Sequence, residues 1–148
     1  MKLHEIESDG KKYIFHAIYN FTEPCPQCGV PACGKEDILW FEKEGKRKAI
    51  IFDGSYLDMA IEDTISANLD QLKKRTLPTF IVEWNVSKGW VDCWDYDGYD
   101  LSSSDFIESM KLIKSAQQDW MPSNQLEALE KLASEAKLEG LSLKIVRG

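Results

Sequence analysis

The chain has 148 residues, of which 43% are hydrophobic and 29% charged, a composition typical of a globular protein with one core. Its net charge of −7 and pI near 4.9 disfavour direct binding to nucleic acid, whose phosphates attract a basic surface. No apolar run approaches the roughly 20 residues that a membrane helix needs. We therefore expect one domain over residues 1–148, with an acidic surface that favours a basic protein partner over nucleic acid or membrane.

The first half of the chain carries two turn signals that predict β-hairpins. Asp9-Gly10 is a dipeptide that favours a tight hairpin turn, and Glu44-Gly45-Lys46 marks a second turn. Each turn separates two predicted strands: residues 2–8 and 11–20, then residues 38–41 and 48–52.

Helix signals occur in three stretches. Apolar residues at spacings of three and four predict an amphipathic helix over about 56–75. The serines at 102–104 are typical N-caps for a helix that runs to about Gln118. A further helix is predicted from Pro122-Ser123 to Gly140, followed by a short strand over 141–146.

Between these helices the sequence predicts a third hairpin, with strands over 79–86 and 90–96 and a turn at Ser87-Lys88-Gly89. Hairpins imply antiparallel pairing, and helices that arrive in groups indicate separate helix and sheet layers. We therefore predict an α+β fold, an antiparallel sheet built from hairpins with about three helices packed on one face.

Three of the four cysteines lie within nine residues, in the segment Cys25-Pro26-Gln27-Cys28-Gly29-Val30-Pro31-Ala32-Cys33-Gly34. This segment falls in a cysteine-rich loop predicted over residues 21–36. Proline and glycine beside the cysteines favour a tight turn that directs two thiolates toward one ion. The Cys-Pro-x-Cys-Gly pattern resembles the knuckle of zinc ribbons and related small zinc modules.

Tetrahedral zinc needs four ligands, and Cys25, Cys28 and Cys33 supply three. We expect His16 as the fourth, with Cys93 or His4 as alternatives. Free thiols, redox chemistry and a disulfide are the other interpretations. The sequence has no apolar signal segment at its start, which predicts a reducing, cytoplasmic location, where clustered cysteines favour metal over a disulfide.

Residues 83–100 combine aromatic and acidic side chains, including three of the five tryptophans. Aromatic side chains dominate interface hot spots, and surrounding carboxylates select a basic partner. The alternative is a core hairpin whose aromatic residues pack inward and whose acids lie in solvent. The candidate partner-binding residues are Trp84, Trp90, Asp92, Trp94, Asp95, Tyr96, Asp97, Tyr99 and Asp100.

The sequence contains no recognisable catalytic motif, such as Gly-x-Ser-x-Gly or a glycine-rich phosphate-binding loop. Asp53 follows a hydrophobic strand, where a turn or N-cap role is the favoured interpretation. We therefore expect a binding protein rather than an enzyme.

Small size, acidity, the lack of a catalytic motif and the aromatic-acidic segment together resemble the immunity proteins of bacterial toxin–immunity systems, including contact-dependent inhibition and colicin-like pairs. This resemblance is one of general character. It implies a cytoplasmic bacterial protein that neutralises a cognate toxin, often a basic nuclease, by covering its active site or by blocking the approach of its substrate. The alternatives are a zinc-stabilised adaptor domain, or a small enzyme that uses Asp53 or the cysteines.

The zinc hypothesis predicts about one zinc ion per chain in protein purified without chelator. Cys28→Ser should then lower the unfolding temperature, because the binding free energy of a structural metal is also folding free energy. Elemental analysis of the purified protein and thermal unfolding of the variant measure both effects. A zinc content below about a tenth of an equivalent would contradict the hypothesis.

Overall fold

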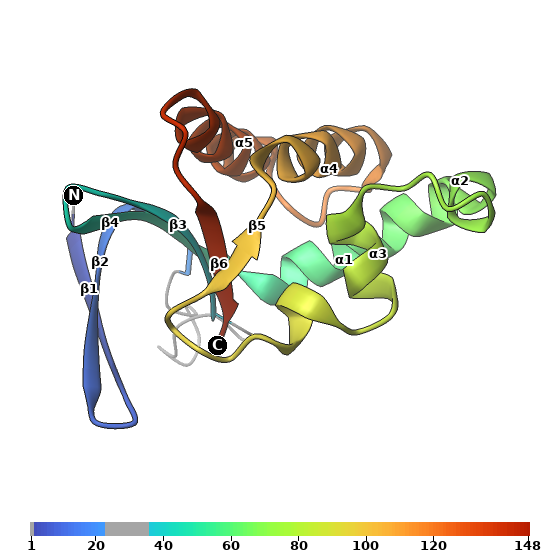
Figure 1. The fold of residues 1–148 in the computed structure, drawn as a ribbon. Helices are drawn as coiled ribbons and strands as arrows, with labels where there is room; N and C mark the ends of the chain where they lie inside the picture. The colour runs from blue at the N-terminus through green and yellow to red at the C-terminus, as the bar shows by residue number, and fades with distance from the viewer. Residues whose placement is uncertain (1, 23–35) are drawn as a thin grey trace, which may run out of the picture.

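Six strands form one mixed sheet in the order β1-β2-β4-β3-β6-β5 (Figure 1). The computed structural model describes residues 2–22 and 36–148 of the chain. Both predicted N-terminal hairpins are confirmed, and Asp9, Gly10, Glu44 and Gly45 all have the positive φ that a tight hairpin turn requires. The strands are β1 (Lys2–Ser8), β2 (Lys11–Asn20), β3 (Glu36–Lys43), β4 (Lys46–Asp53), β5 (Tyr99–Leu101) and β6 (Leu143–Arg147).

The two hairpins meet through a parallel pair, because β2 lies beside β4 in the same direction. The sheet is therefore mixed, whereas the sequence predicted antiparallel pairing only. The register between β2 and β4 shifts at Ile18, which lies between the paired residues Ala17 and Tyr19. Turn signals report only neighbouring strands, so this long-range pairing had no local sequence signal.

The predicted helices are confirmed, with one division. A break at Asn68 divides the stretch predicted over 56–75, and the Asn68 N–H donates to Ile65 O at 3.0 Å. The helices are α1 (Gly54–Ala67), α2 (Leu69–Lys73), α3 (Thr79–Asn85), α4 (Ser103–Ala116) and α5 (Ser123–Leu138). None of the helices in the described part of the chain is both long enough and apolar enough to cross a membrane.

The prediction of a third hairpin is wrong. Residues 79–92 instead form α3 and, after a turn, a short 3₁₀ helix, η1 (Gly89–Asp92). The Asp105 carboxylate, on α4, accepts hydrogen bonds at 2.8 Å from the N–H groups of Thr79 and Phe80 and so caps α3. The Trp90 ring stacks on Phe80 at 4.3 Å, and its indole N–H donates to Phe80 O at 2.9 Å. These tertiary contacts override the strand preference of an aromatic, β-branched sequence.

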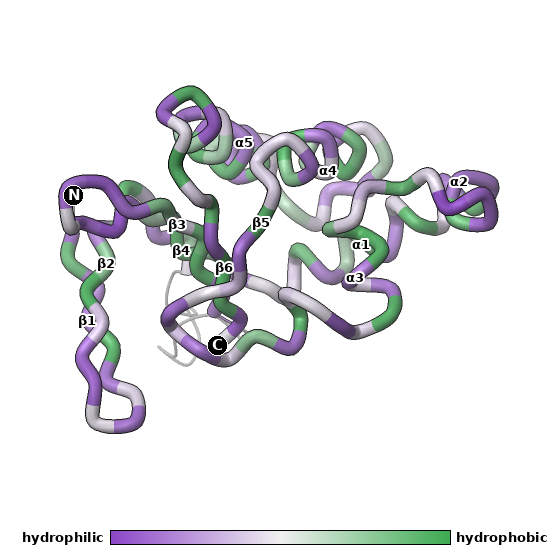
Figure 2. The backbone as a smooth tube through the Cα atoms, in the orientation of Figure 1, coloured by the Kyte–Doolittle hydropathy of each residue, from purple (hydrophilic) through white to green (hydrophobic). Residues whose placement is uncertain are grey.

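The helices lie on one side of the sheet: α5 packs on the central strands β3, β4 and β6, and α4 packs beside α5 and over α1 and α3 (Figure 1). On that face, buried side chains such as Phe41, Ile50 and Ile145 join the core residues of the helices. The opposite face carries a second buried cluster around Phe15 and Trp40. The tip of the β1–β2 hairpin projects away from the helices, and Figure 2 shows that it is hydrophilic.

A buried ionic network joins the end of β6 to β3 and α1. Arg147 Nη2 lies 3.0 Å from Asp37 Oδ2 and 2.8 Å from Asp58 Oδ1, while the side chains of Arg147 and Asp37 are 2% and 0% exposed. The Trp84 indole N–H donates to Asp58 at 2.8 Å, and the guanidinium lies 4.8 Å from the centroid of the Trp90 ring. The network therefore ties α3 and η1 to the sheet as well.

We predict that Arg147→Met destabilises the fold by about 3–5 kcal/mol, because it takes the guanidinium away from the buried Asp37 carboxylate. The matched control on the same strand is Lys144→Met, which removes only a surface pair with Asp100 and should cost at most about 1 kcal/mol. Urea unfolding measures both changes. If the two variants lose equal stability, the network does not support the fold as described.

Candidate functional site

The loop after η1 is held by an aromatic side chain on each side of Trp94. Trp90 is fully buried in the core on the helix side of the sheet. Tyr96 packs against Tyr13 on the opposite face, with 5.6 Å between the centroids of the two rings. Trp94, between them, is 63% exposed. We name the exposed set Asp92, Trp94, Asp95 and Asp97 the Trp94 ridge.

The backbone of this loop is fixed by hydrogen bonds to the sheet. Cys93 O accepts from the Arg147 N–H at 3.0 Å, and Tyr96 O accepts from Arg47 Nη1 at 2.5 Å. Within the loop, the Gly98 N–H donates to Asp95 O at 2.9 Å. A partner would therefore meet a Trp94 ridge whose backbone is already ordered, which lowers the entropic cost of binding.

The carboxylates around Trp94 are only partly neutralised. Asp92 and Asp95 are exposed and form no ion pair within residues 2–22 and 36–148. Asp97 Oδ1 lies 3.9 Å from both Lys11 Nζ and Arg47 Nη2, a long separation for an ion pair. Asp100 pairs with Lys144 at 2.8 Å. The net negative charge of this surface is therefore concentrated beside Trp94.

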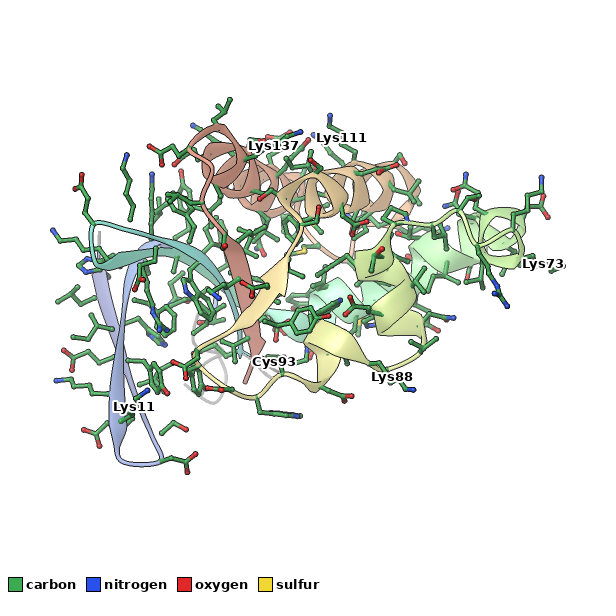
Figure 3. The ribbon with its side chains drawn as sticks, in the orientation of Figure 1. Lys11, Lys73, Lys88, Cys93, Lys111 and Lys137 are labelled. Carbon is green, nitrogen blue, oxygen red and sulfur yellow. The ribbon has the colours of Figure 1, made fainter. Side chains whose placement is uncertain are left out.

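Cys93, labelled in Figure 3, lies between η1 and β5, and its thiol donates to Asp95 O at 3.5 Å. Burial raises the pKa of this thiol, so it is protonated at neutral pH. A protonated thiol is a poor nucleophile, and here the effect of burial on the pKa outweighs the opposing hydrogen bond to Asp95 O and the positive charge of Lys144. The carbonyl of Cys93, which accepts from the Arg147 N–H, helps to fix the loop that carries Trp94.

Several predicted partner-binding residues have roles inside the fold. Trp90 is a core residue and is not available at the surface. Trp84 is half-buried and bonded to Asp58, and the Tyr99 hydroxyl donates to Glu83 at 3.2 Å. The structure thus brings Trp94 together with Asp92, Asp95 and Asp97, and separates Trp90 from them because α3 and η1 replace the predicted hairpin.

Cys25, Cys28 and Cys33 lie outside the described residues, so the predicted zinc site stays a prediction. His16 lies on β2 in a shallow hollow of about 200 Å³ that Lys43 and Glu139 also line. His4 lies on the opposite face of the sheet, with Nε2 2.9 Å from Glu36 Oε1. The described ranges 2–22 and 36–148 contain no cluster of three histidine, cysteine or acidic side chains able to hold a metal.

Asp53 has a structural role. Its carboxylate accepts a hydrogen bond from the Ser55 N–H at 2.8 Å and caps the start of α1. This confirms the N-cap interpretation of Asp53.

Sequence reasoning missed a second group of exposed aromatic and acidic side chains, on α1 and the loop before α5. Tyr56, Met59 and Trp120 are exposed there, together with Glu62. The sequence does contain a signal for this group. Tyr56 and Met59 fall outside the apolar stripe of α1, and the helix as a whole contains three acidic residues and no basic one.

A groove of about 330 Å³ lies between β2 and α5. Its apolar walls include Ile18, Phe21 and Leu132, and its charged groups include the ion pair of Lys48 with Glu135 at 2.7 Å. The charges of both signs at this groove do not select one kind of ligand.

Comparisons of the chain with protein-family models, curated protein sequences and solved structures give no significant match.

We predict that two tryptophan substitutions separate core from surface. Trp90→Ala should cost about 3–5 kcal/mol, because it leaves a cavity beside Phe80 and removes a buried hydrogen bond. Trp94→Ala should change stability by no more than about 0.5 kcal/mol, since most of its ring is already in water. Urea unfolding compares them, and a large loss for Trp94→Ala would show that the ring supports the fold.

Proposed function

We propose that this chain is a binding protein that recognises a basic protein partner through the Trp94 ridge. The observation that carries the proposal is the 63% exposure of Trp94 between two carboxylates, Asp92 and Asp95, that form no ion pair in the described part of the chain. Exposed tryptophan on an ordered backbone is typical of interface hot spots.

The physical mechanism has two steps. The net charge of −7 attracts a basic partner over a distance comparable to the Debye length, about 8–10 Å at physiological salt, and so speeds the encounter. Burial of the Trp94 indole then holds the complex, while basic side chains of the partner replace water around Asp92 and Asp95. The first step sets the association rate and the second the dissociation rate.

We further propose that the partner is a bacterial toxin, such as a basic nuclease, and that the chain neutralises it by covering its active site. The acidity and small size of the chain support this proposal, because an acidic surface matches a protein that binds nucleic-acid phosphates. The second candidate, a zinc-stabilised adaptor domain, shares the binding surface and differs in the partner. A zinc content of about one ion per chain, measured by elemental analysis, would favour that candidate.

A pull-down with matched baits tests the binding proposal. Wild-type protein and the Trp94→Ala variant are both exposed to extract of the native host, and a partner of the ridge is retained by wild type only. Mass spectrometry identifies the retained protein. A partner that is acidic, or that both baits retain equally, would contradict the proposal.

For the purified partner we predict different kinetic effects at the centre and rim of the ridge. Trp94→Ala should raise the dissociation rate by about 30-fold, which corresponds to about 2 kcal/mol. The double variant Asp92→Asn, Asp95→Asn should instead slow association and weaken its salt dependence. Asp100→Asn is the matched control, because Asp100 already pairs with Lys144. Unchanged kinetics for the ridge variants, measured by surface plasmon resonance, would exclude this interface.

Neutralisation is tested separately, in cells that express the identified partner. If the partner is a toxin, co-expressed wild-type protein restores growth and the Trp94→Ala variant restores it less well. A partner that does not affect growth would favour the adaptor.

A further inference from the structure

Helix α1 presents an exposed apolar surface that the proposed ridge does not use. Tyr56, Met59 and Trp120 are each between 40% and 46% exposed, although large apolar side chains are normally buried. Tyr56, Met59 and Asp63 follow one another at spacings of three and four residues, so they lie on one face of the helix. We name this set, together with Glu62 and Trp120, the α1 face.

Trp120 belongs to this surface although it comes from the loop before α5. Its indole N–H donates to Asp63 Oδ2 at 2.6 Å, and the Gln118 N–H donates to the same oxygen at 3.1 Å. The loop is anchored by Met121, which is buried and exchanges two hydrogen bonds with the Gln117 side chain. The indole is therefore held beside Asp63, one helical turn from Met59, and extends the apolar surface.

The exposed charges that α1 and the loop before α5 place around these apolar side chains are negative. Helix α1 contains no lysine or arginine, Glu62 is exposed on it, and Asp119 lies next to Trp120, whereas Asp58 faces Arg147 on the other side of the helix. Glu62 and Asp119 are exposed, and neither forms an ion pair with any residue that the structure describes. An apolar strip bordered by uncompensated carboxylates is complementary to a segment that is apolar on one side and basic at its edges.

We propose that the α1 face is a second docking surface, which binds a basic amphipathic segment of a partner protein. An apolar side chain of the segment lies on Tyr56, Met59 and Trp120, and its lysines or arginines meet Glu62 and Asp119. A second copy of the chain fits poorly, because a two-fold contact through this face would place its carboxylates against one another. The surface is separate from the Trp94 ridge in sequence and in its contacts, so it does not depend on the function proposed there.

The test uses a synthetic helical peptide of about 14 residues built from leucine and lysine, and a control peptide with glutamate in place of lysine. Each is titrated into the isotope-labelled full chain and followed by the indole N–H signals in a nitrogen–proton NMR spectrum. Trp120→Phe and Trp94→Phe assign two of these signals, so one spectrum reports on the α1 face and on the ridge independently.

We expect the lysine peptide to shift the Trp120 signal and the backbone signals of residues 56–63, and the glutamate peptide to leave them unchanged. The isosteric double variant Glu62→Gln, Asp119→Asn should weaken this binding by about fivefold, because it removes both charged contacts and leaves the apolar strip. Urea unfolding of the double variant verifies that its fold is retained, and Asp100→Asn is the matched charge control.

Four results would overturn the proposal: an unmoved Trp120 signal, an equal response to the glutamate peptide, full affinity in the double variant, or shifts that depend on protein concentration without peptide. The last result would identify a second copy as the occupant. A shift of Trp94 without Trp120 would support the ridge and overturn the α1 face.

Discussion

The rest of this structure depends on the buried ion pairs of the Arg147 guanidinium. It joins the last strand to Asp37 on β3 and Asp58 on α1, and it lies over the Trp90 ring. Burial opposes its charge, but the two carboxylates more than offset that effect and raise the pKa of Arg147. Gly54 is required beside it, because an added Cβ would lie 2.5 Å from Asp37 Oδ2. The network fixes the place where the sheet, α1 and η1 meet.

Both proposed docking surfaces lie on elements that contact the Arg147 network. The backbone N–H of Arg147 donates to the carbonyl of Cys93, one residue before Trp94. The side chain of Arg147 packs on the buried Trp90 ring in η1, just before the loop. Asp58 belongs to α1, whose other side carries Tyr56 and Met59. The same buried ionic network thus contacts both the loop that carries Trp94 and the helix that carries Tyr56 and Met59. Substitutions in the network therefore act on the elements that carry both surfaces.

The elements that sequence predicted correctly are those defined by local chemistry. Asp9-Gly10 and Glu44-Gly45 dictate their turns through positive φ, and the apolar periodicity of α4 and α5 is continuous. The prediction of a hairpin over 79–96 failed because the cap at the start of α3 comes from Asp105, on α4. No pattern within the segment itself reveals that cap. The same error concealed the difference between buried Trp90 and exposed Trp94. A strand over 90–96 would place both rings on one face, whereas Trp90 lies in the 3₁₀ helix η1 and Trp94 in the loop after it.

The position of β6 also bears on how the chain reaches this structure. Asp37 and Arg147 are 110 residues apart in sequence, and β3 obtains its second neighbour only when β6 pairs with it. Pairs of such separation form slowly, because a long loop must close before any contact compensates for it. Until then Ile38, Leu39 and Phe41 lie on an open strand edge, which is a template for pairing with another chain. Pairing with β6 therefore covers this apolar edge, and the native sheet ends in the largely polar β1 and the three-residue β5.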